Sequence, residues 1–97
     1  MKIKDIRPGM EGITLVARVL SVGEPKRVMT KFGIASVANA IISDETGKVV
    51  LNLWRNQINL VKPGYIIKVE NAFAKKFKNR VELNVGKRGR ILVLRKA

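Results

Sequence analysis

Apolar residues along this chain alternate with polar residues over short stretches rich in Val, Ile and Leu, which is the pattern of half-buried β-strands. The longest stretch, ITLVARVLSV, covers Ile13–Val22. The stretch over 28–36 predicts a β-hairpin with its tip at 31–33, and VANAIIS continues its second strand. Three further strands are expected at 48–55, 65–73 and 80–86, and an apolar run at 91–94 is expected to extend the barrel. The chain is therefore predicted to be all-β.

Gly, Pro, Asn and Asp mark the connections between these strands. DETG at 44–47 is a turn sequence, because Asp and Thr side chains bond the local backbone and Gly permits a positive φ. NQINLVKPG at 56–64 is the one segment with helical character, and its Pro-Gly pair stops it. KKFKN at 75–79 is expected to connect the last two strands of the barrel. No repeat or linker interrupts the chain, so residues 1–97 are expected to form one domain.

Five strands with a short helix between the third and the fourth is the element order of a single OB-fold, a five-stranded Greek-key barrel. Another small barrel, such as an SH3-like barrel, is compatible with the same order. A chain of 97 residues can bury a core without disulfides or a metal. It has no Cys and no His, which excludes disulfides, thiol nucleophiles, zinc-finger spacings and imidazole acid–base chemistry.

Positive charge is the strongest signal in the composition. Lys and Arg number 20 against 7 Asp and Glu, a formal net charge of +13. Such a field attracts polyanions, so the expected partner is nucleic acid or an anionic membrane surface. Membrane-surface binding favours a basic amphipathic helix, which the sequence lacks, and a thermophile surface would carry more Glu. No stretch suits a membrane span or a signal peptide, so we expect a soluble, cytoplasmic protein that binds nucleic acid and no membrane.

Strand alternation separates Trp54 from the core residues of its own strand. In KVVLNLW, Val49, Leu51 and Leu53 share one face, and Asn52 and Trp54 share the other. The face that carries Asn52 is expected to be the wet one. Trp54 is therefore expected to point away from the core, where it could contact a ligand.

The phenylalanines are placed less directly. The parity of a regular strand points Phe73 inward, so an outward Phe73 requires a bulge or bend near Asn71 and Ala72. The pattern alone leaves a core role and a surface role open. Phe77 stands between cations in the expected connection at 75–79, which favours exposure. Phe32 lies at the hairpin tip, where it either clamps a base or packs on its own hairpin.

Aromatics interleaved with cations suit a single-stranded nucleic acid. Bases stack on aromatic rings whatever their sequence, and Lys and Arg follow the phosphates, whereas a duplex hides its base faces. The candidate binding residues are therefore the aromatics Trp54, Phe73, Phe77 and Phe32, with the cations Arg55, Lys75, Lys76, Lys78, Arg80, Lys87, Arg88, Lys26, Arg27 and Lys31.

The motifs DIRPGM, VARVLSV, DETGKVVLNLW, VKPG and IKVENAFAKKFK…VELNVGK resemble the archaeal type of OB-fold single-stranded-DNA-binding proteins and their eukaryotic sensor relatives. The resemblance covers nearly the whole chain. In that family three aromatics on the open face stack on bases, and the matching positions are Trp54, Phe73 and Phe77. Members commonly continue into a flexible Gly-rich or acidic tail that recruits partners, and this sequence ends at Ala97.

The resemblance implies sequence-nonspecific binding and protection of single-stranded DNA in replication, recombination or repair, by a monomer that works beside other replication and repair proteins. Two alternatives stay open: an RNA-binding OB module and a protein-interaction subunit of a replication-protein-A-like complex. No enzyme, cofactor or metal is expected. Glu70 and Glu82 are expected to face each other across two strands, but no third group completes a catalytic or metal site.

Overall fold

The computed structural model describes all 97 residues. It contains seven strands: β1 (Ile13–Val22), β2 (Lys26–Thr30), β3 (Gly33–Asp44), β4 (Gly47–Trp54), β5 (Ile66–Phe77), β6 (Arg80–Asn84) and β7 (Arg90–Arg95). Two short 3-10 helices accompany them, η1 (Ile3–Asp5) and η2 (Arg55–Asn59). The expected all-β class is confirmed.

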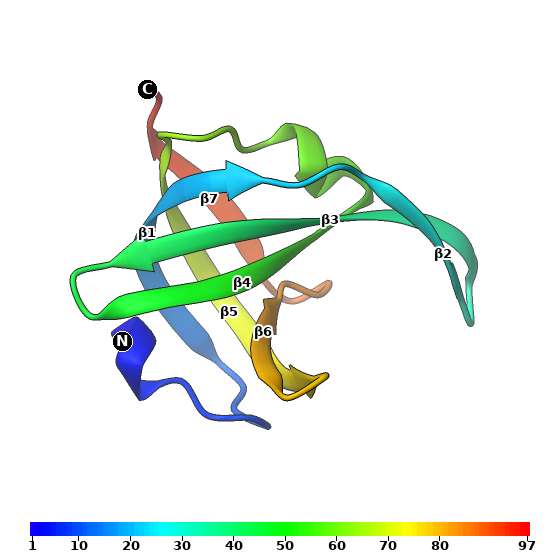
Figure 1. The fold of residues 1–97 in the computed structure, drawn as a ribbon, viewed down its shortest axis with the longest axis horizontal. Coiled ribbons are helices and arrows are strands. Elements are labelled where there is room, and N and C mark those ends of the chain that lie inside the picture. The colour runs from blue at the N-terminus through cyan, green and yellow to red at the C-terminus, as the bar shows by residue number, and fades with distance from the viewer.

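Five of the strands close into a barrel. β1 pairs with β3, β3 with β4, β4 with β6, β6 with β5, and β5 returns to β1. Only the β4–β6 pair in this ring is parallel. The short helix η2 lies between the third and fourth barrel strands (Figure 1). This is the expected OB-fold order, with a single 3-10 turn as the helix.

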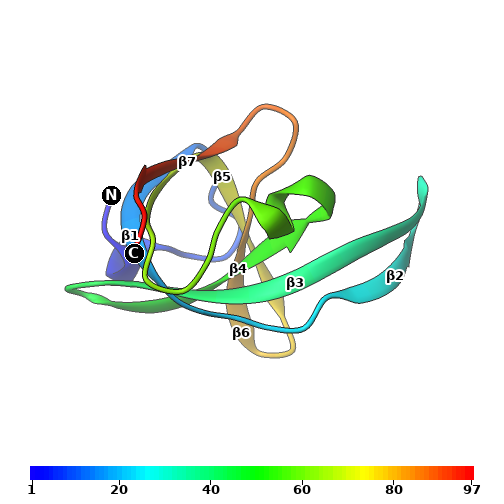
Figure 2. The same cartoon turned by 90° about the horizontal axis from the view of Figure 1, so that it is seen from above.

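Two strands lie outside the ring. β2 pairs with β3 and forms a hairpin arm that projects well beyond the barrel (Figures 1 and 2). Its turn falls at Lys31 and Phe32, within the expected tip. β7 pairs with β5 on the other side of the molecule, so the apolar run at 91–94 extends the barrel sheet as expected.

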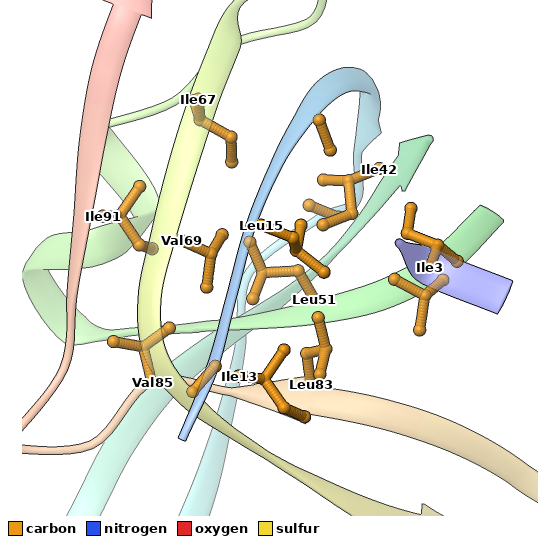
Figure 3. Packing of buried hydrophobic residues seen from close by; sticks show 14 of the residues in the cluster. Ile3, Ile13, Leu15, Ile42, Leu51, Ile67, Val69, Leu83, Val85 and Ile91 are labelled. Atoms are coloured by element: carbon orange, nitrogen blue, oxygen red, sulfur yellow. The ribbon is translucent and has the colours of Figure 1, made fainter. Parts of the chain in front are cut away.

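The core fills the barrel with aliphatic side chains from nearly every strand. Figure 3 shows Leu15, Leu51, Val69 and Leu83 converging in its centre. The residues of β4 with core parity are buried as predicted, while Trp54 lies on the opposite face. Fully burying one Leu, Ile or Val contributes about 1.5–3 kcal/mol. Burial of the apolar face of β4 therefore orients this strand with its polar face away from the core.

A β-bulge at Asn71 changes the face that β5 presents. On β1 the pairing advances by two residues, from Ile13 to Leu15, while on β5 it advances by three, from Ala72 to Val69. Asn71 has a positive φ of 53°. Because one extra residue reverses the alternation, Ala72 is buried and Phe73 faces outward. The bulge expected near Asn71 and Ala72 is confirmed.

Contacts with β1 and with the loop between β6 and β7 hold this bulge. The Asn71 backbone N–H donates to the Thr14 hydroxyl at 3.2 Å, and its side-chain amide donates to the Arg88 carbonyl at 3.1 Å. A Cβ at Gly89 would lie 2.6 Å from the Glu70 carbonyl oxygen and 2.8 Å from that of Asn71. Only Gly lets the loop approach the bulge this closely.

The connection after β5 differs from the expected one. β5 continues through Phe77, and only Lys78 and Asn79 form the turn to β6. Both turn residues have positive φ, 49° and 68°, as in a two-residue primed hairpin turn. Phe77 is thus a strand residue paired with Arg80, because a two-residue turn lets both strands continue where a loop was expected.

Asp44 closes the predicted turn between β3 and β4 and ties it to the N-terminal segment. Its carboxylate accepts hydrogen bonds from the Ile3 N–H at 2.9 Å and the Thr46 N–H at 2.7 Å. Partial burial opposes ionisation, but the bonds from Thr46 and Ile3 hold the pKa of Asp44 below its usual value. The turn thereby fixes η1, whose Ile3 joins the core.

Replacing Gly89 by Ala is expected to lower the free energy of unfolding by about 1–3 kcal/mol, because the added methyl group overpacks the bulge backbone. Gly86→Ala is the matched control in the same loop, since its Cβ would make only an ordinary 3.5 Å contact with the Phe73 ring. Urea unfolding of both variants measures the difference. Equal stability of the two variants would contradict the close packing at Gly89.

Candidate nucleic-acid interface

A groove of about 890 Å³ runs over the outer face of β3, β4, β6 and β5. Strand register sets its floor as one row of side chains. Asn39 of β3 pairs with Asn52 of β4, Asn52 with Asn84 of β6, and Asn84 with Phe73 of β5. The bulge in β5 is what brings Phe73 into this row.

Trp54 stands at the end of β4, half-buried at the groove wall. Its indole N–H donates to the Asn84 side-chain oxygen at 2.9 Å. Its backbone N–H donates to the Gln57 side-chain oxygen at 2.9 Å, and the Gln57 amide donates to the Val85 carbonyl at 3.0 Å. The indole ring is therefore held by β6, and the Trp54 backbone is held by η2.

Phe73 and Phe77 lie on the same face of β5, with Lys75 between them. Phe73 is half-buried and Phe77 is 52% exposed. The Lys75 ammonium lies 5.9 Å from the centre of the Phe73 ring, and Lys78 lies 5.4 Å from that of Phe77, both within cation–π range. Each ring thus stands beside a cation, with part of its surface open to the groove.

The groove is strongly basic. The cations that line it are Lys26, Arg55, Lys75, Lys76, Lys78, Arg80 and Lys87. Glu82 is the one acid in the lining, and it pairs with the Arg80 Nε at 2.7 Å. The remaining groove cations form no ion pair within the protein.

Four predicted residues lie outside the groove lining. Arg27 pairs with Ser36 on the face of the β2–β3 arm opposite to that of Lys26. Phe32 is 79% exposed at the tip of the arm, with the Lys31 ammonium 5.3 Å from its ring centre, so it does not pack on its own hairpin. Arg88 lies in the β6–β7 loop, where its carbonyl bonds Asn71.

The polar floor of the groove was not predicted. Asn52 was expected on a wet face, yet it is only 8% exposed. Its amide donates to the Glu82 carboxylate at 2.9 Å and to the Asn84 oxygen at 3.3 Å, and its own oxygen accepts from the Asn39 amide at 2.6 Å. The signal in the sequence was Asn in strand interiors, where this residue is depleted.

The acidic residues form no metal-binding cluster. The expected facing of Glu70 and Glu82 is wrong, because the bulge and the register place Glu82 opposite Lys75 and Glu70 opposite Arg90. Hydrogen bonds from Arg90, at 2.5 Å, and then from Lys68 lower the pKa of Glu70. No three of His, Cys, Asp and Glu lie close enough to hold a metal ion. No helix is long and apolar enough to cross a membrane.

Known proteins share both the sequence and the fold. Residues 6–93 match the family described as "Single-stranded DNA binding protein Ssb-like, OB fold". The single-stranded DNA binding protein Ssb of Saccharolobus solfataricus is 38% identical over 90 residues, which cover 93% of this chain and 61% of that protein. This chain therefore spans about three fifths of that relative's length.

Two solved structures resemble the whole barrel. The replication factor A related protein from Methanobacterium thermoautotrophicum has a TM-score of 0.80 at 26% identity, over 97% of this chain and 89% of that one. The OB domain of Ta0387 from Thermoplasma acidophilum has a TM-score of 0.85 at 18% identity, over 100% of this chain and 88% of that one, and shows the fold. The sequence match and the barrel agree, and the chain belongs to the Ssb-like family of OB-fold single-stranded DNA binding proteins.

Proposed function

We propose that this chain binds single-stranded DNA without requiring a particular sequence. It thereby protects exposed single strands during replication, recombination or repair. Its location is the cytoplasm, in association with the chromosome. The observation that supports this most directly is the groove itself, where Trp54, Phe73 and Phe77 line one basic surface. Bases would stack on the three rings while phosphates meet the surrounding cations. The relative from Saccharolobus solfataricus is named a single-stranded DNA binding protein, which supports the binding itself.

The spacing of the rings favours an unpaired strand. Phe73 and Phe77 lie four residues apart on one strand, a separation of about 13 Å at roughly 3.3 Å per residue. Stacked bases of a duplex lie only about 3.4 Å apart along each strand. The rings are thus too far apart for adjacent stacked bases, and each ring can stack only on a base whose face is not covered by a neighbouring base, which an unpaired strand provides without breaking base pairs.

The projecting β2–β3 arm extends the proposed contact beyond the groove. Lys26 lines the groove at the base of the arm, and Lys31 and Phe32 stand at its tip. A strand that leaves the groove along the arm would meet these side chains and Arg27 on the opposite face of the arm. A strand that leaves at the other end, near the β6–β7 loop, would meet Arg88. One monomer would suffice for this mode of binding.

Fluorescence of Trp54, the only tryptophan, reports on the proposed site. Oligo-dT should quench its emission strongly, because a base stacks on a ring that is already fixed at the groove wall. A duplex of the same length should quench it weakly. Unchanged emission at saturating single strand would remove Trp54 from the binding surface.

Competition with RNA separates the two nucleic acids in the same assay. An RNA oligomer of matched length also offers base faces and phosphates, and it adds the 2′-hydroxyl. Displacement of bound oligo-dT at a lower concentration of RNA than of DNA would favour an RNA-binding module instead.

Truncating the phenylalanines separates binding from folding. Phe73→Ala and Phe77→Ala should each weaken oligo-dT binding by about 1–3 kcal/mol. Phe77→Ala should leave the unfolding free energy nearly unchanged, and Phe73→Ala should cost less than the roughly 3–5 kcal/mol of a core Phe. Leu94→Ala is the control, since Leu94 is equally exposed, at 53%, but lies on β7 outside the groove. Loss of binding in proportion to loss of stability would assign the rings to the core.

Salt dependence measures the phosphate contacts. Log K should fall linearly with log salt at about −0.7 per phosphate neutralised on a single strand. About three or four of the phosphates in a site of roughly four to six nucleotides should meet a cation, which gives a slope of about −2 to −3. Replacing Lys75, Lys76 and Lys78 together by Ala should flatten the slope and preserve the Trp54 quench at saturation. The control replaces Lys4, Lys62 and Lys96 together by Ala, which removes the same charge outside the groove lining. Equal slopes for both triple variants would mean that only the overall field attracts the strand.

A further inference from the structure

Asn84 lies in the floor of the groove between two of the proposed stacking residues. It pairs in register with Phe73, and its side-chain oxygen accepts the Trp54 indole N–H at 2.9 Å. Only 9% of the residue is exposed, so the part of it that a ligand can reach is small and defined. A base stacked on Phe73 would bring its edge to this side chain.

The hydrogen-bond network fixes which end of the Asn84 amide faces the groove. The Trp54 indole nitrogen is a donor only, so the Asn84 atom that meets it must be the oxygen. That oxygen also accepts from the Asn52 amide at 3.3 Å, so both of its lone pairs are used. Asn52 is fixed in turn, because its amide donates to the Glu82 carboxylate at 2.9 Å. A flipped Asn84 would place two donors against each other.

The Asn84 amino group is left facing the groove. This amino group donates no hydrogen bond within the protein, because both bonds of the Asn84 side chain are accepted by its oxygen. Every fully buried side-chain nitrogen or oxygen does have a hydrogen-bond partner. The Asn84 amino group has none, so it is accessible. Seen from the groove, Asn84 offers donors and no free acceptor. It therefore favours a ligand edge that presents an acceptor.

We propose that Asn84 selects the base seated at Phe73, favouring bases that present a carbonyl oxygen and disfavouring adenine. This rests on the single-strand binding proposed above and adds a base preference to it. Thymine, cytosine and guanine each carry a ring carbonyl. Adenine has no carbonyl oxygen: its acceptors N1 and N7 both lie beside the amino group at C6, which would oppose the Asn84 donor, and its remaining acceptor N3 lies beside the sugar. One neutral hydrogen bond corresponds to about a three- to tenfold change in affinity.

Hypoxanthine tests this preference without changing the stacking surface. It is adenine with the amino group at C6 replaced by a carbonyl. The probes are two thymine strands of equal length, one with adenine and one with hypoxanthine at every third position, titrated by Trp54 quenching. The hypoxanthine strand should bind about three- to tenfold more tightly. Equal affinity of the two strands would overturn the base preference and leave single-strand binding standing, whereas no binding of either strand would overturn both proposals.

Asn84→Asp tests whether Asn84 is the source of the preference. The variant keeps an oxygen for the Trp54 N–H and replaces the groove-facing amino group by an acceptor. The hypoxanthine-to-adenine affinity ratio should fall to one or below. Asn56→Asp is the control, because Asn56 lines the groove, is exposed and adds the same charge outside the network. It should weaken both strands alike and keep the ratio. An unchanged ratio in Asn84→Asp would assign the preference to stacking alone.

Discussion

One extra residue in β5 decides which way the second half of that strand faces. Because side chains alternate with a period of two, the bulge at Asn71 moves every following side chain to the other face. Ala72 and Ala74 are buried in consequence, and Phe73 and Phe77 reach the groove. Without the bulge, two of the three rings would point at a core that is already filled.

The polar side chains of the groove floor are hydrogen-bonded to one another, and most of them are buried. Asn52 and Glu82 are almost fully buried, and buried polar groups are tolerated only when they are hydrogen-bonded. The amides and the Trp54 indole satisfy one another across β3, β4 and β6. Trp54 is thereby held in one orientation, so the proposed binding would cost little conformational entropy at this side chain.

Most of the few acidic residues lie away from the groove. Glu45 bonds Lys2 at 2.6 Å, a contact that lowers the pKa of Glu45 and raises that of Lys2. Glu70 is held between Arg90 and Lys68 on the β7 side of β5. The net charge of +13 is therefore least neutralised along the groove, where only Glu82 is present. A field focused in this way speeds the approach of a polyanion.

The sequence by itself determined the all-β class and the positions of most strands and turns, since alternation and turn residues act locally. It predicted β1, the turn at 44–47, the outward Trp54 and the need for a bulge before Phe73. Tertiary structure decided the rest. Whether β5 bulged depended on Gly89 and Arg88 from a later loop, and the burial of Asn52 depended on Glu82 and Asn84, thirty and more residues away. The strand pattern specifies which face a residue takes, but only pairing between distant strands determines what that residue meets there.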